Sequence, residues 1–370
     1  MVQYKTLVKK VSISPEKKTK QKDYLTKGQL PIIDQGQQLI GGYSDNLDLQ
    51  LSCNLPVIVF GDHTRAVKYV DFPFGAGADG IKVLEPAEGI YPKFLYYATQ
   101  YLVLRLEDRG YARHYQYIQK KELDIPPVSE QKHIVTRIEE LFSELENGVE
   151  TLWKTKQQLA VYRQAVLKDA FSGCDKQASV SSVCTHVTDG DHMPPPKAAS
   201  GIPFIMISNI DGNRIDFSDT AFVGRDYYEN IDSKRRPQVG DVLYSVTGSF
   251  GIPVLVDFEK EFCFQRHIAL LRPNDSILSR YLYYAMQAPD VYAQASKGAT
   301  GTAQKTVGLT VLRKILIPYT ESKTEQDQIV RDIENKMSVC DSIEKTVDTA
   351  LQQAEAMRQS ILKQAFEGRL

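Results

Sequence analysis

The sequence is poor in cysteine and lacks long hydrophobic runs. Its five cysteines among 370 residues lie far apart and form no C-x-x-C pair, so neither a disulfide framework nor a structural zinc site is predicted. No uninterrupted apolar run approaches the ~18 residues that a membrane-spanning helix needs, and the first residues lack the apolar stretch of a signal peptide. We therefore expect a cytoplasmic protein.

Motifs of catalysis are missing as well. There is no Walker loop, no H-E-x-x-H pair and no Asn/Asp-Pro-Pro-Tyr/Phe tetrapeptide of an amino-methyltransferase, and the six histidines form no cluster in the sequence. Residues 75–80 match G-x-G-x-x-G, but a β-like run ending at Pro86 follows where a dinucleotide-binding motif needs a helix. We expect no catalytic residue, metal site or cofactor in this chain.

Charge is nearly balanced overall but uneven along the chain. There are 45 Lys and Arg against 46 Asp and Glu, whereas a nucleic-acid-binding protein usually presents a basic face. Residues 1–128, however, hold 17 basic and 14 acidic side chains, while residues 321–370 hold 7 and 10. The average thus combines a basic first region with an acidic C-terminal segment, and it does not exclude DNA binding.

The chain repeats one plan twice. Three blocks recur in the same order: residues 93–100 as 280–287, residues 123–131 as 315–326, and residues 163–173 as 358–368. Each copy is a region of β-branched, aromatic and turn residues with one short helix, at Phe94 or Tyr281, followed by a charged segment. The predicted domains are residues 1–128, a central long helix at 129–173, residues 174–320, and a C-terminal long helix at 321–370.

Both charged segments carry apolar residues at seven-residue intervals, which is the pattern of a coiled coil. The residues predicted to pack between the helices are Ile138, Leu145, Leu152, Leu159, Val166, Ile333, Val347, Ala354 and Ile361. Cys340 continues the second stripe, and Tyr162 is assigned to a companion seam. The alternative is that each amphipathic helix lies on its own domain. The predicted fold class is α+β: two mixed α/β domains of similar fold joined by a long antiparallel helix pair, with a pseudo-twofold internal repeat.

These blocks in this order resemble the specificity subunit of type I restriction-modification enzymes, over essentially the whole chain. Residues 74–81 and 265–273 also resemble target-recognition domains of that family. The resemblance implies a non-catalytic subunit in which each mixed domain reads one half of an asymmetric, bipartite site in double-stranded DNA. The helix pair would set the spacing and dock two modification (methyltransferase) subunits. S-adenosylmethionine, ATP and Mg²⁺ would be bound by those subunits and by restriction (translocase and endonuclease) subunits.

Candidate DNA-binding residues follow from chemistry, because Arg, Lys, Asn and Gln on loops pair with base edges and lysines contact phosphates. In the first domain they are Lys17, Lys18, Lys20, Lys22, His63, Arg65, Lys68, Arg109, Arg113, His114, Tyr115 and Gln116. In the second domain they are Lys234, Arg235, Arg236, Thr247, Ser249, Arg266, His267, Lys297, Thr300, Thr302, Gln304 and Lys305. An ordinary surface-loop role is the alternative for any one of them.

Two other functions compete with DNA recognition. The triplets at residues 16–18 and 321–323 have the E-x-K form found in metal-dependent nucleases, although Glu321 and Lys323 also fall at the start of a predicted helix. The third possibility is a coiled-coil assembly factor that never binds DNA, which predicts no salt-dependent DNA affinity even with its partner present.

Overall fold

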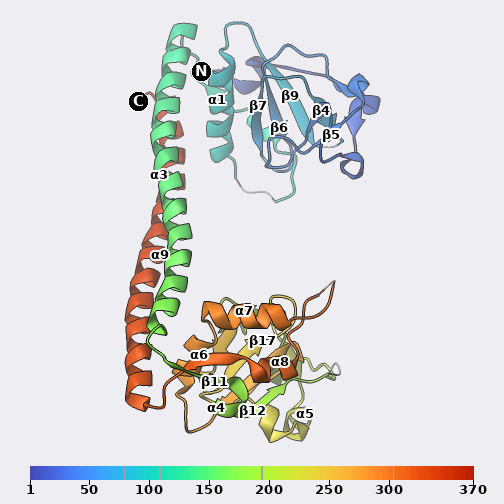
Figure 1. Ribbon diagram of the computed structural model, residues 1–370. Coiled ribbons are helices and arrows are strands. Elements are labelled where there is room, and N and C mark those ends of the chain that lie inside the picture. The colour runs from blue at the N-terminus through green and yellow to red at the C-terminus, as the bar shows by residue number, and fades with distance from the viewer. Residues whose placement is uncertain (79, 108–109, 193–194, 303) are drawn as a thin grey trace. The chain divides into compact units, whose positions relative to one another are not determined.

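The computed structural model describes residues 1–78, 80–107, 110–192, 195–302 and 304–370. The chain divides into two compact units: unit 1 comprises residues 1–153 and 348–370, and unit 2 comprises residues 154–347 (Figure 1). Within the described ranges, no helix is both long and apolar enough to cross a membrane.

The described part of unit 1 contains two four-stranded sheets and one two-stranded sheet. The first has the order β2-β9-β6-β7 and is antiparallel, with β2 (Val8–Lys10), β9 (Ile81–Pro86), β6 (Val57–Gly61) and β7 (Val67–Val70). The second has the order β3-β8-β4-β5, with β3 (Lys18–Thr19), β8 (Gly75–Gly77), β4 (Leu30–Ile33) and β5 (Gly42–Ser44). The pairing of β8 with β3 and β4 is parallel. As predicted, the glycine-rich segment at 75–80 leads into a strand and not into a helix.

The core of unit 1 is built in layers. Strand β6 alternates its side chains, so that Ile58 and Phe60 pack toward α1 (Pro92–Leu104) while Val57 and Val59 pack with residues of the second sheet. Helix α1 lies between this sheet and the long helices α3 (Val128–Ala170) and α9 (Lys323–Phe366) (Figure 1). Strand β1 (Val2–Gln3) pairs with β10 (Glu122–Leu123), and α2 (Tyr115–Ile118) precedes β10.

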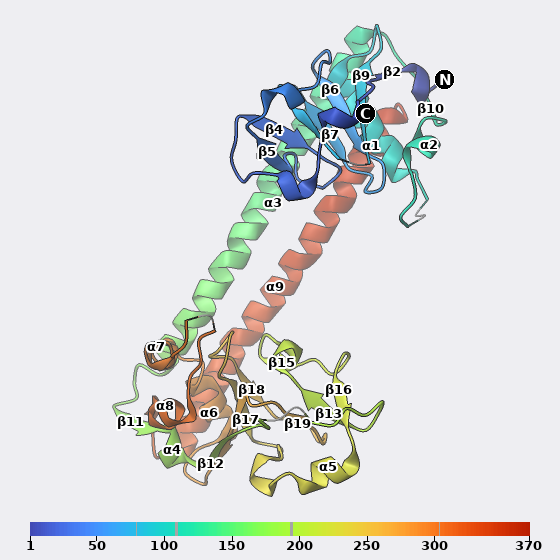
Figure 2. The same cartoon turned by 90° about the vertical axis from the view of Figure 1, so that its right-hand side faces the viewer.

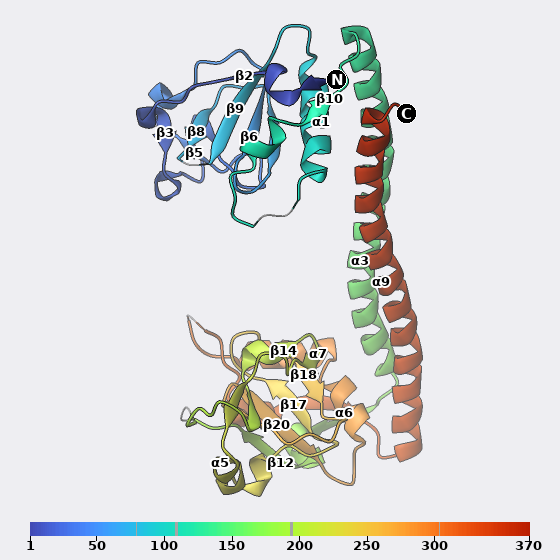
Figure 3. The same cartoon turned by 180° about the vertical axis from the view of Figure 1, so that it is seen from behind.

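Unit 2, shown in Figure 3, has a similar arrangement of strands. Its antiparallel sheet has the order β12-β20-β17-β18, with β12 (Cys184–Asp189), β20 (Ile268–Pro273), β17 (Val242–Ser245) and β18 (Pro253–Leu255). A second sheet has the order β16-β13-β19, with β16 (Ala221–Val223), β13 (Ile202–Ile205) and β19 (Cys263–Phe264), and β13 is parallel to β19. Strand β11 (Lys176–Ser179) pairs with β21 (Leu316–Tyr319), and β14 (Ile210–Asp211) with β15 (Arg214–Ile215). The first sheets correspond strand for strand, and β5-β4-β8 corresponds to β16-β13-β19, whereas β3 and the β14-β15 pair have no counterpart among the described residues. The predicted α+β fold with an internal repeat is confirmed.

Unit 2 has more helices than the sequence predicted. Helix α6 (Ser279–Ala285) corresponds to α1, as expected from the repeated block. Helices α7 (Pro289–Gly298) and α8 (Leu309–Lys314) were missed, because each is short and bounded by proline or glycine. The remaining helices of unit 2 in the described residues are α4 (Val180–Val183) and α5 (Arg225–Asn230). Its 3-10 turns are η5 (Ile207–Asn209) and η6 (Ser233–Arg235). Those of unit 1 are η1 (Tyr4–Thr6), η2 (Pro15–Lys17), η3 (Gln21–Asp23) and η4 (Leu47–Leu49).

The long helices run antiparallel within each unit (Figure 2). In unit 1, Arg358 of α9 lies 3.2 Å from Glu146 of α3, and in unit 2, Lys336 lies 3.3 Å from Asp169. Six of the residues predicted to pack between the helices are buried and three are half-buried: Ile138, Leu159, Val166, Ile333, Val347 and Ala354, then Leu145, Leu152 and Ile361. Tyr162 is 50% exposed, so its assignment to a companion seam was wrong. The neighbouring Arg163 bridges the helices instead, through Asp341 at 2.7 Å.

Candidate nucleic-acid interface

In unit 1, the turn after β6 is tied to neighbouring loops through Asp62, which is 3% exposed. Its backbone N–H donates to the carbonyl of Gly80, and its own carbonyl accepts from the N–H of His114 at 2.8 Å. Its carboxylate accepts from the N–H of Tyr115 at 2.8 Å and pairs with the Lys82 ammonium at 3.2 Å. A buried carboxylate satisfied in this way holds its surroundings together. We call residues 62–65, 80–82 and 111–116 the first loop edge.

A stacked aromatic pair stands on the first loop edge. The rings of His63 and Tyr111 are parallel to within 3°, with centroids 4.3 Å apart, and Nδ1 of His63 lies 3.2 Å from the carbonyl of Ala112. Tyr111 is 83% exposed, and the nearby Arg113 and Gln116 are exposed as well. The fold therefore places the segment of His63 next to the segment of Tyr111, which the sequence alone did not show to be adjacent. Exposed aromatic, guanidinium and amide groups can stack on bases and bond to their edges.

Two candidates of unit 1 face inward, contrary to the prediction that they contact DNA. Lys68 is 5% exposed and its ammonium donates to the carbonyl of Asp34 at 2.8 Å. Burial lowers the pKa of Lys68. His114 is 1% exposed, with Nε2 3.3 Å from the carbonyl of Gly110. Lys68 therefore holds the loop at Asp34, and His114 is buried inside the first loop edge.

The other candidates of unit 1 occupy varied positions. Arg65 has φ 62°, a left-handed conformation that is uncommon outside glycine and that recurs at functional sites. Lys17 donates to the backbone carbonyls of Asp48 and Gln50. Lys18, Lys20 and Lys22 are exposed, and Tyr115 is half-buried against Phe60. Arg109 lies outside the described residues.

Unit 2 presents an equivalent edge, built by backbone hydrogen bonds. The N–H of Val246 donates to the carbonyl of His267 at 2.9 Å, and the N–H of Gly248 donates to the carbonyl of Lys305 at 3.0 Å. The N–H of Val307 returns a bond to the carbonyl of Val246 at 2.8 Å. The turn after β17, the turn before β20 and the loop after α7 are thereby joined. We call residues 246–249, 265–267 and 304–307 the second loop edge.

Two predicted arginines of unit 2 lie beside residues that sequence reasoning missed, namely Asp189, Asp191 and His192. Arg266 is exposed, and its backbone N–H donates to the carbonyl of Asp191 at 3.1 Å. Arg235 lies 3.5 Å from Asp189 and 3.7 Å from Asp191. Nε2 of His192 lies 2.9 Å from Asp189. The carboxylates orient the side chains of Arg235 and His192. The only signal for this in the sequence is an acidic residue on either side of Gly190.

A small cavity of about 280 Å³ adjoins Arg266 and His267. Its apolar lining includes Phe204, Met206 and Phe222, and its polar lining includes His192. An apolar floor with basic and imidazole groups at its margin is suited to contacts with the face or the methyl group of a base.

The remaining candidates of unit 2 divide by exposure. Arg236 donates to the carbonyl of Ile231 at 2.9 Å and lies over the Tyr228 ring, which gives it a structural role. Thr247 is 6% exposed and lies 3.3 Å from the hydroxyl of Thr306, so it cannot present its hydroxyl to DNA as predicted. The exposed candidates are Lys234, Ser249, Arg266, Lys297, Thr300, Thr302, Gln304 and Lys305. Of these, Lys297 lies in the last turn of α7 and not in a loop.

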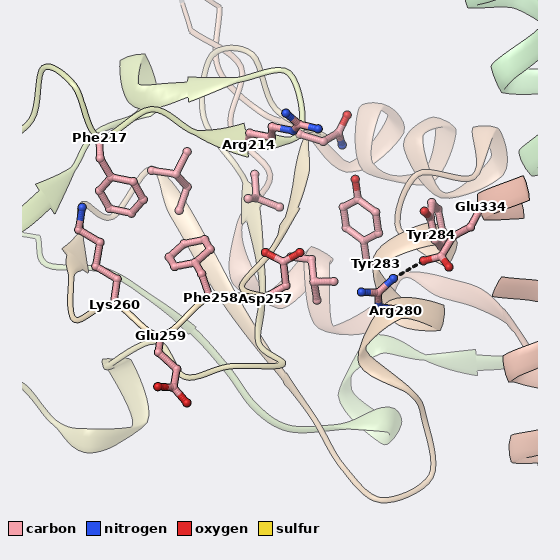
Figure 4. A pocket seen from close by; sticks show the side chains of 14 residues that line it. Arg214, Phe217, Asp257, Phe258, Glu259, Lys260, Arg280, Tyr283, Tyr284 and Glu334 are labelled. Carbon is pink, nitrogen blue, oxygen red and sulfur yellow. Dashed lines mark hydrogen bonds and ion pairs between the residues drawn. The ribbon is translucent and has the colours of Figure 1, made fainter. Parts of the chain in front are cut away.

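A larger cavity of about 700 Å³ in unit 2 lies elsewhere, beside α6 and α9 (Figure 4). Arg280 of α6 pairs with Glu334 of α9 at its margin, and Lys260 lies 3.8 Å from the centre of the Phe217 ring. Basic and acidic side chains are equal in number around it, at three each. That balance does not suit a polyanion.

The described residues do not support the nuclease alternative. Glu321 is exposed and pairs with Lys176 at 2.9 Å. In the part of the chain that the structure describes, no group of three His, Cys, Asp or Glu residues is placed to hold a metal ion.

The fold and the loop edges define a duplicated recognition module mounted on paired helices. The chain belongs to the type I restriction modification DNA specificity domain family, whose model matches residues 8–152 and 195–353. This confirms the resemblance found in the sequence.

Individual relatives are distant. The chain is 24% identical, over 68% of its length, to the specificity subunit of the type I restriction enzyme EcoBI of Escherichia coli, covering 59% of that protein. It is 26% identical, over 67% of its length, to the EcoKI specificity subunit of Escherichia coli strain K12, covering 57% of it. The chain thus spans less than two thirds of either relative. A solved chain from a type I R-M system shares the fold, with a TM-score of 0.70 at 16% identity, over 100% of this chain and 97% of its own.

Proposed function

We propose that this chain is the DNA sequence-specificity subunit of a type I restriction-modification complex. The observation that carries the proposal is the duplicated edge: two units of one topology place equivalent loops at equivalent strand ends. The side chains on those loops differ, with His63, Tyr111 and Arg113 on one edge and Arg266, His267 and Lys305 on the other. Two different readers require two different half-sites, so the target is asymmetric and bipartite.

The division of labour follows from the residues present. Exposed lysines such as Lys18, Lys20 and Lys22 neutralise backbone phosphates, whereas the loop edges read bases. The antiparallel helices set the spacing of the half-sites and dock two modification subunits. Those subunits bind S-adenosylmethionine, and restriction subunits bind ATP and Mg²⁺. This chain supplies no catalytic group and binds none of these cofactors, and it acts in the cytoplasm on double-stranded DNA.

The test is a methylation map. The chain is co-expressed with its modification subunit, and methylated adenines are mapped across the genome; one split, asymmetric motif is expected. A continuous palindrome, or no motif, contradicts the proposal.

Incubation of the purified chain with plasmid and Mg²⁺ tests the nuclease alternative, which requires cleavage that Glu321→Ala abolishes. Absence of salt-dependent DNA binding by the complex would favour the assembly factor.

A further inference from the structure

Two buried glutamines occupy matching positions in the units. Gln131 of α3 is 1% exposed and Gln326 of α9 is 0% exposed, in contrast to the other glutamines of these solvated helices. Burying an amide side chain destabilises the folded state unless its hydrogen bonds are satisfied. The partners of these side chains therefore show what the burial achieves.

Gln131 connects the start of α3 to two other segments of unit 1. Its Oε1 accepts from the N–H of Tyr91, the residue before α1, at 2.8 Å. Its Nε2 donates to the carbonyl of Gly89 at 3.0 Å and to the carbonyl of Pro126 at 2.8 Å. One side chain thus joins the long helix, the loop that leads into α1 and the segment that leaves β10.

Gln326 makes the same set of bonds in unit 2. Its Oε1 accepts from the N–H of Leu278, the residue before α6, at 2.8 Å. Its Nε2 donates to the carbonyl of Ser276 at 3.0 Å and to the carbonyl of Thr320 at 2.8 Å. Only an amide of this length combines an acceptor with two donors, since glutamate cannot donate when ionised. The repeated Glu-Gln dipeptide of the sequence therefore has a structural meaning.

The glutamines lie at the opposite end of each sheet from the loop edge. In unit 1 the first loop edge precedes β9 at Gly80, whereas Gly89 follows the end of β9 at Pro86. In unit 2, His267 precedes β20, whereas Ser276 follows its end at Pro273. Neither glutamine is placed to touch DNA bound at the edges. Each instead connects the region that carries the edge to a long helix.

We propose that Gln131 and Gln326 are positioning residues for DNA recognition: each holds its unit's reading region at one angle to the long helices, and so restricts the spacer between the half-sites. The inference rests on the proposed function. Without the amide, the carbonyls before α1 and before α3 lose a shared donor, and the loop that leads into α1 can shift relative to the helix. The bases read by each edge should not change, because the edge residues are untouched.

The experiment uses the full chain in complex with its modification subunit. Methylomes are compared for the wild type, Gln131→Met, Gln326→Met, and the controls Gln158→Met and Gln353→Met, which alter exposed glutamines of the same helices. The wild type and controls should methylate one spacer length. Each buried-site variant should also methylate sites with a spacer one base pair longer or shorter, at least tenfold above the wild type, with both half-site sequences retained.

Several outcomes separate this inference from a purely structural role. If the variants methylate the wild-type spacer alone, at a uniformly lower rate, the glutamines only stabilise the fold and the inference is wrong. If a Met variant does not accumulate, Gln131→Glu and Gln326→Glu, which keep the size and the acceptor, must show the relaxed spacer or the inference fails. A wild type with no bipartite motif would instead overturn the proposed function itself.

Discussion

Basic residues of this chain differ in whether their charged groups reach solvent. Lys68 and Arg266 are both basic residues of strand-and-turn segments, yet Lys68 is buried against Asp34 and Arg266 is exposed. The difference depends on the path of the loop around Asp34, which lies 34 positions from Lys68 in the chain. Residue type predicts a positive charge at both positions, whereas the direction of the Lys68 side chain depends on a contact that is distant in the sequence.

Arg266 is expected to read a base in one half-site. Its guanidinium is exposed while its backbone is fixed by Asp191, so Arg266→Ala should relax the preference at one position by ~10 to 100-fold, corresponding to about 1–3 kcal/mol for a bidentate contact. The thermal midpoint should not move. Methylome comparison measures the preference, with Arg331→Ala, an exposed arginine of α9, as the control. An unchanged motif would remove Arg266 from the set of readers.

Two buried thiols make unit 2 sensitive to alkaline pH. Burial raises the pKa of Cys184 and of Cys263 to about 12, whereas an unfolded thiol titrates near pH ~8.5. The folded state therefore holds protons that the unfolded state loses, and stability is complete below pH ~8.5 and falls above it by about 1.4 kcal/mol per pH unit per thiol, until the pH passes the folded pKa.

Chemical unfolding between pH 8 and 11 measures this decline. Cys184→Ala should flatten the slope, at the cost of a lower stability at pH 8, because it removes one titrating group. Mass spectrometry after alkylation at pH 8 gives an independent check, since neither thiol should be labelled before unfolding. Rapid labelling of Cys184 in the folded chain would contradict the burial.

At the scale of elements, periodicity predicted the long helices well because a seven-residue pattern sustained over more than forty positions leaves little ambiguity. Their ends were less predictable. Gly368 has φ 70° and follows α9 as a C-terminal glycine should, whereas Gly173 after α3 does not take a positive φ. The chain continues from Gly173 directly into β11, and that connection replaces the usual left-handed cap.

Aromatic residues at the helix ends complete the core of each unit. Phe171, just after α3, contacts Tyr281 of α6 with ring centroids 5.4 Å apart, and Phe366 of α9 contacts Phe94 of α1 at 5.2 Å. The repeated Ala-Phe-x-Gly block is thus explained by packing. The amphipathic helices therefore match both interpretations of the sequence: they pack on each other, and they also pack on the globular regions.

Removing either ring should weaken one unit. Phe171 is 6% exposed, so Phe171→Ala should destabilise unit 2 by about 3 kcal/mol, while Phe366→Ala, which removes a half-buried ring, should cost unit 1 about 2 kcal/mol. Hydrogen exchange resolved by peptide locates the loss. Val161→Ala, at a side chain 71% exposed, is the control and should change stability by less than about 0.5 kcal/mol. Equal loss of protection in both units after Phe171→Ala would show that they do not unfold separately.

For the whole molecule, the division into units differs from the domains predicted from sequence. The sequence placed the helices in segments of their own, at 129–173 and 321–370, whereas contacts assign the first part of α3 and the last part of α9 to unit 1. The sequence could not show that the end of α9 belongs to unit 1, because Leu362 and Ala365, which join the core around α1, lie more than 250 positions from α1 in the chain. The last part of the C-terminal segment, residues 348–370, therefore helps to support the first region, whereas residues 321–347, which carry the acidic excess, belong to unit 2.

Because the end of α9 belongs to unit 1, the boundaries of the segment matter when the first recognition region is exchanged for that of a relative. Replacing residues 1–128 with those of a relative also replaces Phe94 and Tyr101, whose rings contact Phe366. A graft of residues 8–86 keeps α1 and its ring contacts with Phe366. It replaces residues 62–65 and 80–82 of the first loop edge, including His63 and Arg65, and leaves residues 111–116 in place. Because unit 2 keeps its own loop edge, the graft should alter the sequence of one half-site and leave the other unchanged. Methylome mapping reads both halves in one experiment, and a graft that altered both would mean that the two edges do not read DNA independently.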